Sequence, residues 1–363
     1  MTYYNISNYI SLIAYENSNI NINVRISKVN VAIIGASGYL GSRLLEYLLL
    51  NKEINVAGFN QRSKRLSNHY LEHHHIRYLK SSMISNQELH TFDYVIYLGG
   101  LTGKLVCQQA SNQSLVTENI DDIAQLVLRM SVTQVLIFAS TASIVEGIGS
   151  TPSRENDLVD VESLDIYSQS LYQRELILSK LVEDRGDQIS IIGLRLATVV
   201  GVSPNQRMDD ISLNLLVRNA FLDGYLTVTN AHIYRSILWM EDFIRAIEQM
   251  VLTPVTAVKP GFHLYNMASI HGTIAKFANH IAWRTGARVI YNSEAIHKVG
   301  FTLNTAKFSS DYNFTFTNDT DIVIQNLIDN VRVFRLKDSI TKENNYFVVL
   351  MLSLLLTKFN KSF

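Results

Sequence analysis

The sequence predicts an α/β fold: a doubly wound parallel sheet with a smaller C-terminal substrate-binding lobe. Continuous apolar runs alternate with helical patterns through the first two hundred residues, which is typical of a parallel sheet covered by helices on both faces. A glycine-rich turn joins the first run to the first helix. The chain has 363 residues, 47% of them hydrophobic, and a chain of this length buries about three quarters of its unfolded surface.

The strands are predicted where short apolar runs end in glycine or small residues. These runs are residues 29–34, 56–59, 94–98, 135–139 and 189–194. Helical patterns cover 42–50, 120–130 and 167–183. After Gly201 the pattern loosens into mixed elements.

The chain is therefore expected to divide into a sheet domain, a second lobe and two terminal segments. Residues 1–28 form an N-terminal extension, and residues 29–200, with later strands from about 236–266, form the sheet domain. Residues 201–235 and 267–335 form the lobe, and 336–363 an apolar tail. The apolar run at 346–356 is shorter than the roughly 17–25 residues that span a bilayer, so we expect it to pack on protein rather than to enter a membrane.

The charge balance and the single cysteine exclude several classes of protein. Lysine plus arginine and aspartate plus glutamate each number 32, which argues against nucleic acid as a partner. Cys107 alone cannot form an internal disulfide and fits a cytoplasmic setting. His69, His73, His74 and His75 cluster in the sequence, but with so few companion ligands we expect no metal site.

The glycine turn indicates a dinucleotide site. The turn between the first strand and the first helix contains three glycines, Gly35, Gly38 and Gly41. Ser37, Tyr39 and Leu40 are among the residues that separate these glycines. Glycine permits the tight turn, the approach of a pyrophosphate and close packing of helix on strand. The helix N-terminus then offers unpaired N–H groups to phosphate.

Four further segments follow this turn in order. They read FASTASIV at 138–145, DIYSQSL at 165–171, LRL at 194–196 leading to Gly201, and RSILWMED at 235–242. With the GxxGxxG spacing of the turn, the series resembles the extended short-chain dehydrogenase/reductase superfamily, in its NAD-dependent epimerase/dehydratase group, over about residues 29–333. The resemblance implies a Rossmann fold, NAD or NADP as cofactor and a nucleotide-diphosphate sugar as substrate.

Cofactor contacts follow from the resemblance at two further places. Asn60 stands where the family has an acid that bonds the adenosine ribose, and Arg62 follows it. An amide can still bond a ribose hydroxyl, and an arginine can pair with a 2′-phosphate, so NAD and NADP both stay open. The run 94–98, which ends at Leu98, and the following Gly99 and Gly100 resemble the family's fourth strand, whose small residues pass beneath the cofactor. Asn119 resembles the family's asparagine on the next helix.

The resemblance places the catalytic hydroxyls at Tyr167 and Thr141, with Ser140 or Ser143 as alternatives to Thr141. The family's 4,6-dehydratases carry Asp-Glu after this threonine, whereas Ala142 and Ser143 follow it here. Elimination of water is therefore disfavoured.

One departure from the family pattern affects the predicted chemistry. Leu171 stands where the family has a lysine, four residues after the tyrosine and so on the same helix face. Ionising an ordinary tyrosine at pH 7 costs about 4 kcal/mol, which a nearby cation reduces and leucine does not. Arg174 or Lys104 could supply the missing charge.

The second lobe is expected to hold the nucleotide sugar. The resemblance assigns substrate contacts to Arg207, Asn214 and Arg235, the last to a diphosphate. The favoured activity is 4-epimerisation with NAD. The second hypothesis is reduction of a 4-keto sugar with NADPH. A non-catalytic binding protein of the same fold is the alternative that Leu171 suggests. Related enzymes dimerise through paired helices, so a homodimer through residues 167–183 is a further hypothesis.

Overall fold

The computed structural model describes residues 28–62, 71, 74–146, 151–205, 207–208, 210–292 and 300–342. Residues 1–27 of the predicted N-terminal extension and most of the predicted C-terminal tail lie outside these ranges.

A seven-stranded parallel sheet forms the centre of the molecule. Its order is β10-β6-β5-β4-β1-β2-β3. The strands are β1 Val29–Ile34, β2 Ile54–Phe59, β3 Ile76–Arg77, β4 Tyr94–Tyr97, β5 Val135–Thr141, β6 Ser190–Leu196 and β10 Gly261–Met267. The strand order reverses at β1: the chain adds β2 and β3 on one side of β1 and then crosses to β4 on the other side. Ligands of doubly wound sheets bind outside the carboxyl ends of the strands at such a point. The predicted fold class is confirmed.

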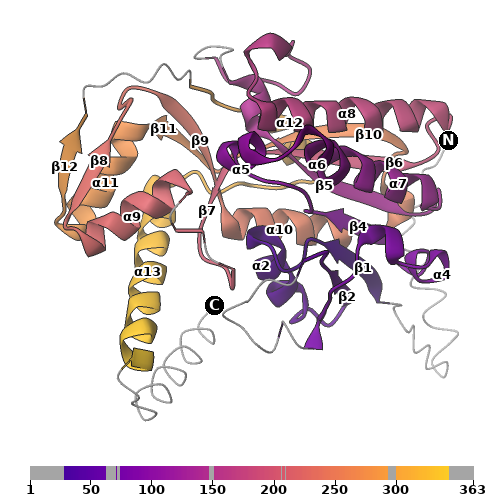
Figure 1. Cartoon of the computed structure of the whole chain (residues 1–363), viewed down its shortest axis with the longest axis horizontal. Coiled ribbons are helices and arrows are strands. Elements are labelled where there is room, and N and C mark those ends of the chain that lie inside the picture. The colour runs from indigo at the N-terminus through magenta and orange to yellow at the C-terminus, as the bar shows by residue number, and fades with distance from the viewer. Residues whose placement is uncertain are drawn as a thin grey trace, which may run out of the picture.

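Helices cover both faces of this sheet (Figure 1). Helices α2 (Tyr39–Leu48) and α10 (Met240–Val251) pack together on one face, and α7 (Asp122–Arg129) and α8 (Ile166–Asp184) on the other. Alternate residues of β1 separate accordingly: Val31 and Ile33 belong to one apolar cluster, Ala32 and Ile34 to the other. Both faces are therefore buried, as the continuous apolar runs predict.

Short helices connect the strands on the α8 side and around the sheet edges. They are η1 Ser81–Met83, α4 Asn86–Leu89, α5 Lys104–Gln109, α6 Asn112–Val116, the π-helical turn η2 Thr117–Asp121, η3 Ala142–Val145, η4 Val161–Ser163 and η5 Val255–Ala257. The helix predicted at 120–130 is thus η2 and α7 together.

A second lobe lies beside the carboxyl edge of the sheet (Figure 1). It holds the sheets β11-β9-β7 and β12-β8. Its elements are β7 Thr198–Val200, α9 Ser212–Leu222, β8 Tyr225–Val228, β9 Tyr234–Trp239, β11 Ile270–Thr273, α11 Ile274–Thr285, β12 Arg288–Tyr291 and α13 Thr320–Lys342, while α12 Ala306–Asp311 packs on β10. Of the strands expected from 236–266, β10 joins the main sheet, but β9 pairs with β7 and β11 instead.

Helix α8 carries an unusual amount of buried polarity. Asp165 caps it by accepting from the backbone N–H of Ser168 at 2.9 Å, as short polar residues do at helix starts. Its buried face includes Ser168, Ser170, Arg174 and Glu175. Buried polar groups need partners, so this face points to a site rather than to a simple packing surface.

The apolar run at 346–356 falls outside the described ranges. Within those ranges, none of the helices has the length and apolar character needed to cross a bilayer.

Candidate active site

The glycine turn is closed so tightly that side chains cannot enter it. Gly35 has φ +90°, and a Cβ there would lie 2.8 Å from the carbonyl carbon of Leu98. A Cβ on Gly41 would lie 2.2 Å from the oxygen of Gly35. Gly38 has an ordinary φ of −71° and a looser fit, 3.1 Å from the same oxygen. The turn therefore brings β1, the end of β4 and the start of α2 into direct backbone contact.

The geometry of this turn fits a dinucleotide's phosphates. Helix α2 begins without a capping side chain and without an acid in its first turn, so its first N–H groups remain available to an anion. The buried hydroxyl of Ser37 has no hydrogen-bond partner among the described residues. A buried hydroxyl without a partner is costly, and a ligand oxygen would satisfy it.

Residues 201–205 are bonded to the far side of the turn. The hydroxyl of Tyr39 donates to the Gly201 oxygen at 2.8 Å. The Asn205 side chain donates to the backbone carbonyl of Ser37, also at 2.8 Å, and the Ser203 hydroxyl donates to the backbone carbonyl of Tyr39. The turn is thus attached to the segment that leads into the second lobe.

Asn214 completes this attachment, and its place differs from the one expected. Its amide donates to the Tyr39 hydroxyl at 3.2 Å and to the Arg207 oxygen at 3.0 Å, and its own oxygen accepts from the Gly201 N–H at 3.3 Å. Asn214 is completely buried. It holds the junction from within rather than presenting an amide to a substrate.

The end of β2 carries an internal ion pair. The Asn60 side chain donates to the Arg62 carbonyl, and the Arg62 guanidinium pairs with Glu118 of η2. Arg62 is largely exposed, and Glu118 is mostly buried. The arginine that could bind a 2′-phosphate is therefore already paired with a carboxylate.

Gly99 and Gly100 lie over a group of buried polar side chains. Gly100 has φ +128°, and a Cβ there would meet Asn119 Oδ1 at 2.6 Å and a guanidinium nitrogen of Arg174 at 2.8 Å. The Asn119 side chain accepts from the Leu101 N–H at 2.7 Å and donates to the Ser170 hydroxyl at 2.9 Å. Asn119, expected to contact the cofactor, thus fastens the loop after β4 to α8.

Tyr167 and Thr141 come together at the carboxyl end of β5. Burial raises the pKa of Tyr167, and a hydrogen bond from Thr141 and the charges of Arg174 and Arg207 oppose that rise. Thr141 Oγ1 accepts from the Ser143 N–H at 3.1 Å, which leaves its own proton to donate. Donation to the charged form of a phenol favours ionisation.

Ser140, one alternative to Thr141, is used elsewhere. Its hydroxyl donates to Glu175 at 2.5 Å. Glu175 also receives Arg195 Nε at 3.0 Å and Nη2 at 2.7 Å. All three residues are at least 97% buried. This network ties α8 to β5 and β6 and leaves Thr141 as the hydroxyl beside Tyr167.

A buried arginine lies one helical turn beyond Leu171, the position at which the family has a lysine. Leu171 is 5% exposed and Arg174 2%. The Arg174 guanidinium donates to three backbone oxygens, those of Asn119, Ala139 and Gly99, and stacks 5.6 Å over the Tyr97 ring. The backbone of Lys104, the other candidate cation, starts α5, and its side chain lies outside the described part of the structure.

The two arginines expected to bind the nucleotide sugar each form an ion pair with a carboxylate of this chain. Arg207 pairs with Asp210 through two guanidinium nitrogens and approaches Gly103 of the loop after β4. Arg235 pairs with Glu146 at 2.9 Å and lies 5.1 Å over the Phe301 ring. The charge of Arg207 favours the ionised form of both Tyr39 and Tyr167, so Arg207 lies near both phenols.

Only His74 and His75 of the histidine cluster lie within the described ranges. His69 and His73 lie outside the described ranges. Among the residues that are described, no group of three or more potential ligands could hold a metal ion.

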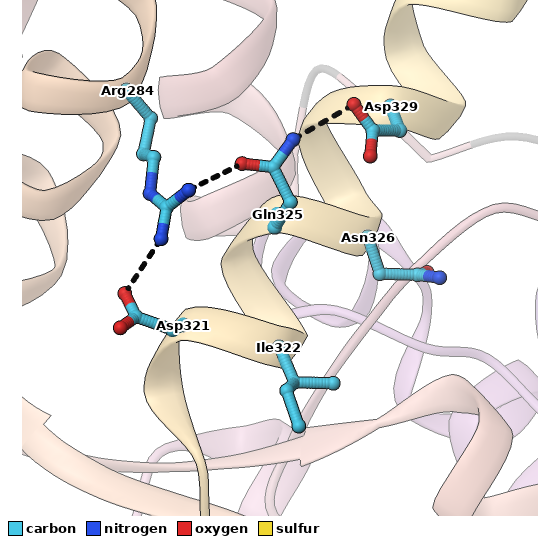
Figure 2. Close-up of a pocket in the computed structure, with 6 residues that line it drawn as sticks. All are labelled: Arg284, Asp321, Ile322, Gln325, Asn326 and Asp329. Carbon is cyan, nitrogen blue, oxygen red and sulfur yellow. Dashed lines mark hydrogen bonds and ion pairs between the residues drawn. The ribbon is translucent and has the colours of Figure 1, made fainter.

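A cavity of about 400 Å³ opens on the second lobe, away from these residues (Figure 2). Arg284 of α11 donates to Gln325 at 3.1 Å and pairs with Asp321 at 3.3 Å, and Gln325 donates to Asp329 at 2.8 Å. These polar groups already bond one another. None of the residues predicted for the site lines this cavity.

Several residues of the site escaped the sequence reading. Glu118, Glu146 and Asp210 are carboxylates whose role becomes visible only through their arginines, and Asn205 follows Pro204 in a segment without a regular pattern. Glu175, eight residues after Tyr167 on α8, does match a glutamate of the family motif, but its buried partners Ser140 and Arg195 were not predicted.

Comparison with known proteins gives one family and many similar folds. The model of the NAD dependent epimerase/dehydratase family matches residues 31–268. Uncharacterized protein MJ1055 of Methanocaldococcus jannaschii is 24% identical over 245 residues, which cover 60% of this chain and 70% of that protein.

Solved structures of about the same size share the fold. UDP-glucuronic acid 4-epimerase from Bacillus cereus, in complex with UDP-glucuronic acid and NAD, matches with a TM-score of 0.70 and 20% identity, over 84% of this chain and 99% of that one. MoeE5 in complex with UDP-glucuronic acid and NAD gives 0.69 and 21%, over 84% and 99%. dTDP-glucose 4,6-dehydratase from Bacillus anthracis, in complex with NAD, gives 0.69 and 15%, over 84% and 96%.

Proposed function

The chain belongs to the NAD-dependent epimerase/dehydratase family, and from this premise we propose that it is an enzyme that epimerises a nucleotide-diphosphate sugar at C4. One observation carries the proposal: Tyr167 and Thr141 meet at the end of β5, on the sheet edge that also bears the glycine turn. Ala142 and Ser143, which follow Thr141 in η3, have no acid or base with which to eliminate water. This supports epimerisation over dehydration.

The protein's own groups would move one proton and hold the reacting sugar. Tyr167 would take the proton of the sugar 4-hydroxyl, and Thr141 would bond the same oxygen and orient it. NAD, when bound, supplies the hydride acceptor and donor for C4. Gly35, Gly38 and the first turn of α2 would hold its phosphates, and Ser37 would bond one of their oxygens.

The polarity around Arg62 supports NAD over NADP. Glu118 neutralises Arg62, and a carboxylate at this point would repel a 2′-phosphate. Asn60 would bond the ribose once its amide leaves the Arg62 carbonyl. An epimerase must keep its cofactor through the reaction, so this preference also favours epimerase over an NADPH-dependent 4-ketoreductase.

The lobe arginines would receive the diphosphate of the sugar nucleotide. Arg207 and Arg235 both face carboxylates that hold their guanidinium groups in place. A planar guanidinium matches two phosphate oxygens, so a diphosphate would compete with Asp210 and Glu146 for the same donors.

Turnover of a small panel of sugar nucleotides tests the proposal. UDP-glucuronic acid and UDP-glucose, the ligands of the similar structures, would be incubated with protein and NAD and the products separated by anion-exchange chromatography. Formation of the 4-epimer, lost about 10²–10⁴-fold in Tyr167→Phe and retained in the exposed control Tyr225→Phe, supports the proposal. A wild-type chain that forms no epimer from any sugar nucleotide in the panel contradicts it.

The buried Leu171 favours a second candidate, a protein of this family that binds the ligands without turnover. Calorimetry distinguishes the two. Binding of NAD and a sugar nucleotide together with no detectable epimer or reduced cofactor would support the binding protein.

A further inference from the structure

Arg174 is a buried cation without a carboxylate partner. It is 2% exposed, and no carboxylate of the described residues lies within ion-pair distance of it. Glu175, its neighbour in sequence, is engaged by Arg195 and Ser140. Removing a charge from water is expensive unless it is paired, and carbonyl oxygens compensate only part of that expense. An arginine kept charged in such a place indicates an anion that forms nearby.

The position of Arg174 identifies that anion. Arg174 follows Tyr167 by seven residues on α8, which is two turns along the same face. Its guanidinium is fixed at the carboxyl edge by carbonyls from β5, η2 and the loop after β4. The charge of Arg174 acts on Tyr167 and on Tyr97, over whose ring it lies.

We propose that Arg174 is the residue whose fixed positive charge supports ionisation of Tyr167, in place of a cation at position 171. The inference rests on the proposed function, in which Tyr167 accepts a proton. Arg174 is a positioning residue rather than a catalytic one, because its donors are used by the backbone and it acts through its field. Burial keeps that field strong, since it is weakly screened.

The other groups facing Tyr167 do not replace it. Arg207 also acts on the phenol, but Asp210 neutralises it, and a substrate phosphate would do so further. Thr141 donates a hydrogen bond, and the buried thiol of Cys107, close to Tyr167 in the same apolar cluster, disfavours a phenolate. Around Arg174 itself, Tyr97 and Glu175 are the other ionisable neighbours.

A fluorinated tyrosine at position 167 gives a direct test. Fluorination lowers the pKa of a phenol toward neutrality, so its ionisation can be followed by fluorine NMR without exposing the protein to strong alkali. The apo full-length chain would be compared as wild type, Arg174→Met, Arg174→Lys and Leu171→Lys, and Arg218→Met serves as a matched control far from α8 in sequence.

The expected result is a graded change in the pKa of the labelled phenol. Arg174→Met raises it by about one unit or more, which is about tenfold less phenolate at a given pH below it. Arg174→Lys raises it less, and Leu171→Lys lowers it below the wild-type value. Arg218→Met leaves it unchanged.

Two outcomes overturn the inference. An unchanged pKa in folded Arg174→Met, whatever its melting temperature, would show that Arg174 only binds the backbone. If Arg174→Met does not fold, an unchanged pKa in Leu171→Lys would show that the phenol does not sense cations on this helix face. The titration needs neither cofactor nor substrate, so a failure of turnover counts against the proposed function alone.

Discussion

The buried network around Glu175 predicts a large loss of stability on a conservative change. Glu175→Gln keeps the shape of the side chain but removes the charge that pairs with Arg195 at 2.7 Å and accepts from Ser140. The Arg195 charge then stays buried with only the Glu155 carbonyl, 3.1 Å away, as a further partner. Breaking a buried pair in this way costs about 3–5 kcal/mol.

The size of the effect can be measured by thermal unfolding. At an unfolding entropy of about 2.1 cal/mol/K per residue, the loss corresponds to a fall in melting temperature of about 4–7 °C for a chain of this size, measured by circular dichroism or calorimetry. Glu183→Gln is the matched control, because Glu183 lies on the same helix and its ion pair with Lys180 is exposed on both sides. Exposed pairs contribute little, so its melting temperature should stay within about 1 °C.

Replacing both partners gives a second arm of the experiment. Glu175→Leu with Arg195→Met removes both charges and should recover most of the loss, since apolar residues often replace a buried pair without penalty. A melting temperature for Glu175→Gln within about 2 °C of wild type would refute the reasoning. So would a double variant less stable than Glu175→Gln.

Three further predictions concern the cofactor site and alkaline pH. Gly41→Ala should abolish NAD binding measured by calorimetry, because its Cβ would lie 2.2 Å from a backbone oxygen. Gly38→Ala should still fold and bind NAD more weakly than wild type, because its Cβ would lie 3.1 Å from that oxygen and its φ is ordinary. Equal effects of the two variants would contradict this. Glu118→Gln should raise the affinity for NADPH relative to NADH about tenfold by freeing Arg62, and an unchanged ratio would place the 2′-position elsewhere. The free energy of unfolding should fall as pH rises above about 10. The unfolded chain loses phenolic protons first, because burial raises the pKa of three folded-state tyrosines, Tyr47, Tyr97 and Tyr312, to about 12. A flat profile from pH 9 to 11 would be the contrary result.

The sheet domain could be predicted from the sequence because its signals are local. The run at 29–34 coincides with β1, and the glycine turn lies between it and α2. Both follow from neighbouring residues and from burial on two faces. The second lobe gave weaker signals: β7 has three residues and β9 six, and their pairing depends on contacts far apart in the chain.

The site was predicted in its position more than in its bonding. Tyr167 and Thr141 lie together because the helix and strand that carry them are regular and adjacent. The partners of Asn119, Asn214 and Ser140 could not be read, because an amide or hydroxyl bonds whichever group the tertiary fold brings to it. The internal carboxylates beside Arg62, Arg207 and Arg235 come from distant or irregular segments for the same reason.

The bonds between the glycine turn and residues 201–205 imply that the dinucleotide and the sugar nucleotide of the proposed function would change each other's affinity. Asn205 and Ser203 bond the backbone of the same turn that would receive the cofactor's phosphates, and Arg207 lies just beyond them. Under the proposed function, a sugar nucleotide that draws Arg207 toward itself would pull on the turn, and a dinucleotide bound at the turn would restrain Arg207. Thermodynamic linkage makes such an influence reciprocal: whatever factor the first ligand applies to the affinity of the second, the second applies to the first.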